Sequence, residues 1–312
     1  MNPAGKVACY QYCDLIIRSQ LVLPGLPVVA DALAYDIDVQ VAPVPETLPG
    51  ARQFSPFVSL AGTEALWQFA PIGRFHIHNR GCVIAVESAQ AASADAVAAF
   101  LLQPVFALAL MFRGEFLLSA ASVSDGQNVI AFAGGPAVGK SVVAAAIRQK
   151  GFQLVSDSLL RITVSETGVP MAHPQAPWQQ LWPDALEKLH VEGGQSVIRP
   201  ELSVRNVASS LETRALPLKR LLLLRSQDGS VGSGEISLSA VDAGVEKLKC
   251  IRGNTAASDW LEAFAGNEGI PARWLLALVA KVKLDRLSIP WDWSTVSNES
   301  AHKLVEALEF ET

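Results

Sequence analysis

The segment Gly134–Ser141 constrains the fold of this chain more than any other part of the sequence. Its residues, GGPAVGKS, match the pattern G-x-x-x-x-G-K-[ST] at every fixed position. The apolar run Val129–Ala133 precedes it and predicts a strand. The stretch from about Lys140 to Lys150 is rich in Ala and Val and predicts a helix that ends before Gly151. A strand, a glycine-rich loop and a helix in this order predict a phosphate-binding P-loop.

The residue types in this loop are those that phosphate binding requires. Glycine lets the backbone approach phosphate oxygens where a side chain would collide, and the following helix presents its positive N-terminal end to the same anion. We expect Lys140 to reach the β- and γ-phosphates and the Ser141 hydroxyl to bind Mg²⁺, so the predicted cofactors are ATP and Mg²⁺. The residues expected to hold the nucleotide are Gly134, Gly135, Pro136, Ala137, Val138, Gly139, Lys140, Ser141 and Val142.

The acid Asp157 follows the next apolar run, Phe152–Val155, which predicts a short strand after the P-loop helix. A carboxylate there can hold Mg²⁺ through water or accept a proton from an attacking hydroxyl. We therefore predict Asp157 and Lys140 as catalytic residues, and Ser141 and Asp157 as metal ligands. The alternative interpretation of Asp157 is a solvated residue that caps a turn. No guanine-specifying Asn/Thr-Lys-x-Asp segment follows the loop, which disfavours a GTPase.

Strand and helix patterns divide the chain into two predicted domains. Residues 1–112 are expected to form a smaller β-rich N-terminal domain that ends in a buried helix, Ser93–Arg113, with Ser93 as its N-cap. Residues 113–312 alternate strands with helices, which predicts an α/β domain built around the P-loop. The other predicted strands are Asp14–Arg18, Phe57–Leu60, Arg74–His78, Cys82–Val86, Phe116–Val123 and Leu221–Leu224, and the other predicted helices are Asp259–Phe264, Pro271–Val282 and Ser300–Leu308.

Composition indicates the cellular compartment of the protein and excludes some classes of partner. Half of the residues are apolar and 18% are charged, yet the most apolar stretch, Ala96–Phe112, is shorter than the roughly 20 residues of a membrane span, so it predicts a core helix. The N-terminus does not resemble a signal peptide, and four cysteines predict free thiols in a reducing compartment. The net charge of −5 without a basic run disfavours nucleic acid and anionic membranes as partners. We therefore expect a cytoplasmic protein.

Three further groups of residues have two interpretations each. His76 and His78 alternate on one strand face, but no third metal ligand is placed, so strand histidines are favoured over a metal site. Arg199 and Arg205 are either surface residues or cations that steady a transferred phosphate. The tryptophans, expected to fill the core or a groove rather than to stack on a ligand, are Trp178, Trp182, Trp291 and Trp293.

The order of the segments around the loop resembles the kinase domain of the HPr kinase/phosphorylase family. A strand with small residues, Leu117–Val123, precedes NVIAFAGGPAVGKS, a helix, and the run Gly151–Asp157. The similarity is closer to shorter bacterial relatives, which include the kinases that modify lasso-peptide precursors. Further similar segments are Tyr10–Pro27, His173–Pro174, Leu181–Leu186, Pro217–Arg220 and Leu287–Pro290.

The resemblance implies transfer of the γ-phosphate of ATP to a serine hydroxyl of a peptide or protein substrate, such as a ribosomal peptide precursor. It gives the phosphates to Lys140 and the loop backbone, the metal to Ser141, and the role of base to Asp157. The chain differs from the family at Ser158, where a second acid is usual, and at Ser119, where a histidine is frequent. HPr itself is disfavoured as a substrate, because the family's glutamate-arginine-glycine stretch is not evident.

Two alternative functions stay open at this point. One is a catalytically weak, nucleotide-gated protein that binds a peptide or partner, and the other is a small-molecule kinase. The sequence specifies neither the phosphate acceptor nor the oligomeric state, and it does not exclude a homo-oligomer.

Overall fold

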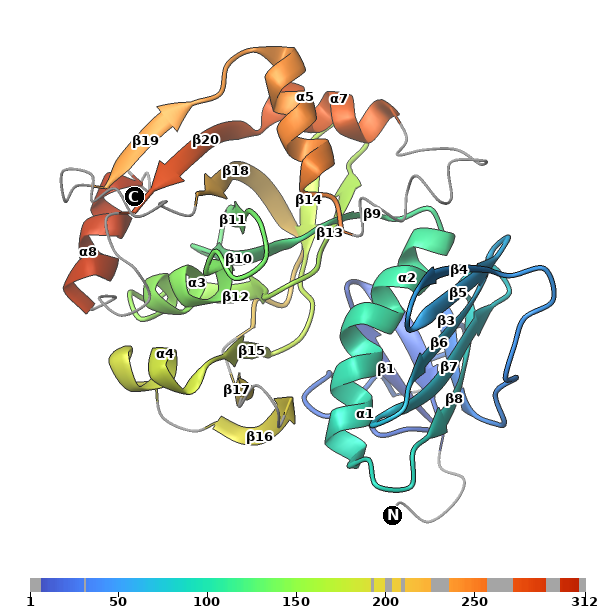
Figure 1. Ribbon diagram of the computed structural model, residues 1–312. Coiled ribbons are helices and arrows are strands. Elements are labelled where there is room, and N and C mark those ends of the chain that lie inside the picture. Colours follow the sequence, from blue (N-terminus) through green and yellow to red (C-terminus); the bar gives the residue numbers. More distant parts are fainter. Residues whose placement is uncertain are drawn as a thin grey trace. The chain divides into compact units, whose positions relative to one another are not determined.

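The computed structural model describes residues 7–30, 32–191, 194–199, 204–208, 211–225, 236–256, 272–289 and 298–308. Within these residues the chain forms two compact units, the first ending at Phe116 and the second beginning at Leu117. The sequence places this boundary at residue 113. The protein is mixed α/β, mostly β, with large mixed sheets and few helices, which confirms the predicted α/β class at that level (Figure 1).

The first unit contains an eight-stranded sheet in the order β1-β2-β3-β8-β7-β6-β5-β4. The pairs β2–β3 and β3–β8 are parallel, and the other neighbours are antiparallel. The strands are β1 (Ala8–Tyr12), β2 (Leu15–Ser19), β3 (Ile37–Val41), β4 (Arg52–Ser55), β5 (Val58–Ala61), β6 (Glu64–Phe69), β7 (Gly73–His78) and β8 (Val83–Ser88). Buried and more exposed residues alternate along β2 and β7, because successive side chains of a strand point to opposite faces.

A single helical stretch follows the sheet in the first unit, as α1 (Ala94–Phe100), a π-helical turn (Leu101–Val105) and α2 (Phe106–Phe112). The Ser93 hydroxyl accepts a hydrogen bond from the Ala96 N–H at 3.1 Å, which confirms the predicted N-cap. Pro104 lies inside the π-helical turn. Proline has no N–H to donate, so the regular α-helical ladder is interrupted there.

This helical stretch is long enough and apolar enough to cross a membrane. However, 56% of its most apolar 18-residue window is buried inside the protein. The Phe100 ring stacks on Phe69 and Phe75 and meets Trp67 edge-on, with centroids 5.4–5.6 Å apart. The Tyr12 hydroxyl donates to the Leu102 carbonyl. The helix is therefore mostly buried, as predicted for a core element.

Gly81, in the turn between β7 and β8, packs directly against α2. It has φ of 80°, and an added Cβ would lie 2.0 Å from the Ala109 carbonyl oxygen. Gly81→Ala should therefore lower the free energy of unfolding by about 2 kcal/mol more than Gly62→Ala, because overpacking adds to the cost of the left-handed backbone. Gly62 is the matched control, since it also has positive φ (59°) but nothing within 4 Å of an added Cβ. Denaturant unfolding of both variants measures the difference, and equal losses would contradict it.

The second unit contains a nine-stranded sheet whose central strand is β18 (Leu216–Leu224). β18 pairs in parallel with β11 on one side, and on the other side with β14 (antiparallel) and β20 (parallel). The continuous order is β12-β10-β11-β18-β14-β13-β9, and β19 pairs with β20. The other strands are β9 (Phe116–Leu118), β10 (Ala120–Ser124), β11 (Val129–Ala133), β12 (Gln153–Ser156), β13 (Leu160–Val164), β14 (Pro170–His173), β19 (Ser237–Ala240) and β20 (Lys283–Ser288).

The predicted strand Phe116–Val123 is two strands, which corrects the sequence analysis. β9 lies beside β13, whereas β10 lies between β11 and β12. The break falls at Ser119, whose backbone N–H donates to the Asn254 carbonyl at 2.8 Å. Ser119 and Ser122 are the polar residues of this otherwise apolar run, and hydrophobic periodicity alone gave no sign that its two halves have different neighbours.

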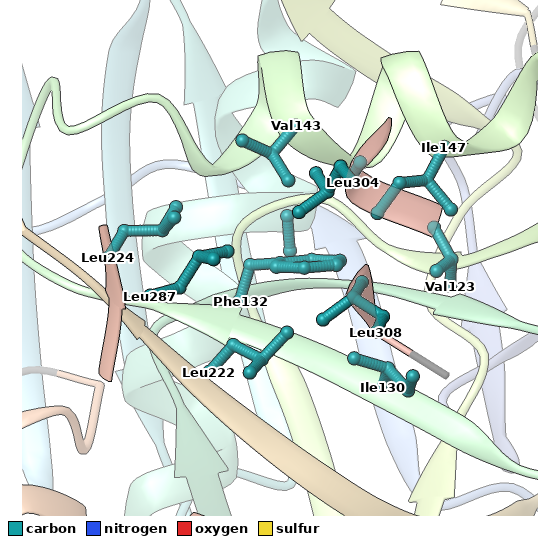
Figure 2. Packing of buried hydrophobic residues seen from close by; sticks show 12 residues of the cluster. Val123, Ile130, Phe132, Val143, Ile147, Leu222, Leu224, Leu287, Leu304 and Leu308 are labelled. Atoms are coloured by element: carbon teal, nitrogen blue, oxygen red, sulfur yellow. The ribbon is translucent and has the colours of Figure 1, made fainter. Parts of the chain in front are cut away.

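Helix α3 (Lys140–Arg148) packs on one face of this sheet. Figure 2 shows Val143 and Ile147 of α3 directed toward Phe132 of β11, with Leu222 of β18 beside them. The same core contains Leu304, which belongs to α8 (Asn298–Ala307), and Leu308, which follows that helix. The other helices are α4 (Pro183–Lys188), α5 (Gly244–Gly253) and α7 (Ala272–Lys281).

A separate three-stranded sheet of the second unit lies beside α3 (Figure 1). Its order is β15 (Trp178–Leu181), β17 (Val204–Ala208) and β16 (Gly194–Arg199). Val142, Ala145 and Ala146 of α3 pack against Leu181 and the residues of α4. The predicted helix Asp259–Phe264 and two of the tryptophans, Trp291 and Trp293, lie outside the described residues.

Candidate functional site

The topology of the second sheet brings the P-loop segment and Asp157 to one edge. β10 is antiparallel to both β11 and β12, so β11 and β12 run in the same direction. Gly134 follows the end of β11, and Asp157 follows the end of β12. β18 is parallel to β11, so its carboxyl end reaches the same edge. Loops at the carboxyl ends of parallel strands are a frequent place for ligands in such sheets.

The backbone of the loop requires glycine at two of the positions that the motif fixes. At Gly134, with φ of 143°, an added Cβ would lie 2.8 Å from the Leu224 carbonyl oxygen and 3.0 Å from Cγ1 of Val138. Gly139 has φ of 90° and precedes α3 as its N-cap residue. Ala137 has φ of 57° without being glycine, a conformation that costs a residue with a side chain about 1–2 kcal/mol. Gly135, by contrast, has nothing within 4 Å of an added Cβ.

The N-terminus of α3 opens onto this loop. Gly139 offers no side chain to cap the helix, and the first turn carries no acid. Lys140 donates from Nζ to the carbonyls of Gly134 and Gly135, both at 2.9 Å. Burial lowers the pKa of Lys140, and the nearby charge of Asp157 opposes that shift. The positive N-terminal end of α3 and the Lys140 ammonium group therefore both lie at the loop, an arrangement that favours binding of an anion.

Asp157 is 4% exposed, so its interpretation as a solvated turn residue is wrong. Its Oδ2 accepts a hydrogen bond from the Gln180 N–H at 2.8 Å. Its Oδ1 is buried and has no hydrogen-bond partner among the described residues. Burial raises the pKa of Asp157 to about 6, against the lowering effects of the Gln180 N–H, the Ser141 and Gln179 side chains and the Lys140 charge.

The neighbouring hydroxyl of Ser158 shares this situation. Its Oγ is buried and makes no hydrogen bond within the described part of the chain. Unsatisfied buried oxygens are rare in folded proteins and ask for an explanation such as an ion or a water molecule. Here two such oxygens, from Asp157 and Ser158, are adjacent in sequence at the edge where the loop lies.

The oxygen atoms of Asp157 and Ser141 are suitable ligands for a Mg²⁺ ion that binds together with a nucleotide. Mg²⁺ prefers oxygen ligands, keeps several waters and is held in such sites by one or two protein groups plus phosphate oxygens. Asp157 Oδ1 and the Ser141 hydroxyl are groups of this type. Across the described residues no three His, Cys, Asp or Glu side chains are grouped as a metal cage, so the protein would supply few of the ligands.

Three residues near Asp157 were not predicted from the sequence. The backbone N–H of Gln180 bonds Asp157, and the Gln179 side chain, fully buried, accepts from Arg148 Nη1 at 2.7 Å. Gln179 Nε2 also lies 3.4 Å from the Ser141 carbonyl oxygen. The sequence indicated only that Ser141 and Arg148, seven positions apart, would lie on the same face of the helix. Nothing local indicated that β15 would return to this helix.

The remaining candidates lie elsewhere or have other roles. His76 and His78 belong to the first unit, where their rings stack at 4.7 Å and His76 Nε2 lies 3.1 Å from Glu64 Oε2. The prediction that Trp182 fills a core or groove is wrong, since it is 48% exposed. Arg199 and Arg205 lie in β16 and β17, and their side chains are outside the described part of the structure. None of the four cysteines forms a disulfide.

A scan of the chain against models of protein families finds no match, and no curated protein matches it significantly.

Proposed function

We propose that this protein is an ATP- and Mg²⁺-dependent kinase that transfers the γ-phosphate to a serine hydroxyl of a peptide or protein substrate. The observation that carries the proposal is the buried Asp157 carboxylate, with one oxygen unpartnered in the described structure, beside Ser141 and Lys140 at the P-loop edge of the sheet. A buried acid with a raised pKa next to a cationic phosphate-type loop is a typical functional arrangement. The resemblance to HPr kinase-like proteins points to serine as the acceptor.

In this mechanism the protein acts mainly by positioning and electrostatics. The loop N–H groups and Lys140 bind the phosphate oxygens, and Ser141 and Asp157 would hold Mg²⁺, which when bound neutralises charge on the phosphates. The serine oxygen forms a bond to the γ-phosphorus as the bond from that phosphorus to the bridging oxygen of ADP breaks. Asp157 orients the serine hydroxyl and accepts its proton.

A second candidate function is a nucleotide-gated protein that binds a peptide or partner with little catalysis. The observation that favours it is Ser158, a neutral residue whose buried hydroxyl stands where kinases of this type have a second acid. A small-molecule kinase would use the same residues and differ only in the acceptor. We expect either form to work in the cytoplasm, alone or as a homo-oligomer.

Lys140→Ala should weaken Mg-ATP binding by 10-fold or more, since a charge-assisted contact to phosphate contributes roughly 1.5–3 kcal/mol. Isothermal titration calorimetry measures the affinities. The matched control is Lys219→Ala, which removes the same charge at an exposed position of β18 in the same unit and should leave the affinity unchanged. Equal affinities of wild type and Lys140→Ala for Mg-ATP would contradict the proposal that this loop binds the nucleotide phosphates. Transfer of labelled γ-phosphate to serine-containing peptides by wild type then separates the kinase from the binding protein.

A further inference from the structure

Arg148 and Ser141 lie on the same face of α3, two helical turns apart. Side chains of a helix are directed toward its N-terminus, so the long Arg148 side chain extends back along this face. There its Nη1 donates to Oε1 of Gln179, at 2.7 Å. The basic residue in the last turn of the helix thus acts close to the first turn, where the P-loop ends.

Gln179 is a buried amide with different partners at its two ends. Oε1 accepts from Arg148, while Nε2 lies 3.4 Å from the Ser141 carbonyl oxygen. The same side chain lies close enough to Asp157 to stabilise its charged form. The N–H end of the amide therefore faces the Ser141 carbonyl, and the same side chain lies near the Asp157 carboxylate.

The direction of this amide is not determined by shape. The oxygen and nitrogen of glutamine are nearly equal in size, so only the hydrogen-bond partners distinguish the two orientations. A guanidinium donates and never accepts, which allows only the amide oxygen to face Arg148. With the amide reversed, its oxygen would face the carboxylate and the carbonyl, and its N–H groups would face the guanidinium. Both ends would then be repelled.

Burial of Arg148 is costly for the protein. Burial lowers its pKa, and the charge of Asp157 is what opposes that effect. Among the described residues no carboxylate forms a direct ion pair with Arg148, and its Nε is buried without a hydrogen-bond partner. A partly buried guanidinium needs partners that offset its lost hydration, and the Gln179 amide oxygen and the charge of Asp157 have this role here.

We propose that Arg148 is a positioning residue that acts through Gln179: it fixes the amide so that its N–H groups face Asp157 and the Ser141 carbonyl. This inference rests on the proposed kinase function for its effect on the reaction. Gln179 then holds the Asp157 carboxylate toward the acceptor hydroxyl, and Arg148 touches neither substrate nor nucleotide.

The kinetic test compares Arg148→Met, which keeps an unbranched stem but removes every donor, with Arg148→Lys, which keeps a charged donor. Arg148→Met should lower the rate of phosphoryl transfer about 10-fold, as expected for one charged hydrogen bond, with Mg-ATP affinity within about 2-fold of wild type. Arg148→Lys should recover most of the rate. Gln179→Glu places an oxygen toward Asp157 and should reproduce the loss. Thermal melts of the three variants check that each is folded.

A second test needs no activity and uses the free protein. The side-chain NH₂ signals of Gln179, identified in ¹⁵N–¹H spectra by their disappearance in Gln179→Glu, should exchange slowly with water in wild type. They should shift and exchange faster in Arg148→Met but remain in Arg148→Lys. Unchanged signals in Arg148→Met would overturn the positioning role. The expected spectra without any transfer by wild type would instead refute the kinase proposal, and expected spectra with equal transfer in Arg148→Met would show that the amide direction does not affect the reaction.

Discussion

Asp157→Asn should lower phosphoryl transfer by about 10²–10⁴, the range for loss of a general base, while Mg-ATP binding weakens far less. Asparagine has nearly the same shape and can still accept the Gln180 N–H bond that Oδ2 receives. It cannot take a proton from the acceptor serine at neutral pH. Single-turnover transfer from labelled ATP to a serine peptide, together with calorimetric affinities, separates chemistry from binding.

The control for this variant is Asp184→Asn, the same chemical change at an exposed residue in the first turn of α4. It should leave transfer and affinity unchanged. Transfer that survives within a few-fold in Asp157→Asn would mean that the base is another residue, and that the burial of Asp157 has a structural origin.

The same substitution should change how stability depends on pH. The pKa of Asp157 is about 6 in the folded protein against 3.8 for an ordinary aspartate, because burial disfavours its charge. Folding therefore favours the protonated acid. The contribution of Asp157 to stability is fully present below pH 3.8, declines as the pH rises, and is lost above about pH 6. The difference in pKa corresponds to about 3 kcal/mol.

Asparagine does not ionise, so the free energy of unfolding of Asp157→Asn relative to wild type should rise by about 2 kcal/mol between pH 4 and pH 8. Urea unfolding of both proteins without Mg²⁺ at the two pH values measures this difference. Asp184→Asn, being exposed, should show no comparable change. A difference between wild type and Asp157→Asn that is independent of pH would contradict a raised pKa at this position.

The strand and the helix on either side of the loop could be predicted from the sequence, because each depends only on residues that are neighbours in the chain. The strand predicted at Val129–Ala133 has the bounds of β11, and the helix predicted from Lys140 to Lys150 is α3, which ends at Arg148. Hydrophobic patterning and the glycine before the helix are local properties, so they are readable without the fold. The burial of Asp157 was not predicted, because it comes from β15 lying over the end of β12.

What the sequence could not provide are pairings between distant segments. The split between β9 and β10 at Ser119 follows from different neighbouring strands, β13 for one half and β11 with β12 for the other. Gln179 is separated from Arg148 by three strands, so nothing local in the sequence indicates the 2.7 Å hydrogen bond between them. Trp182 was misjudged because an aromatic residue predicts burial only on average, and here it stands just before α4 on the surface.

The position of β18 has a consequence for the order in which the site comes into existence. Ile130 of β11 lies opposite Arg220, and Leu222 lies opposite Asp285 of β20, so the centre of the sheet joins segments made at very different times. Pairings of this kind are entropically costly to close and slow to form. Gly134 rests against the Leu224 carbonyl. During synthesis the GGPAVGKS segment therefore leaves the ribosome long before the strand that fixes its first glycine has been made.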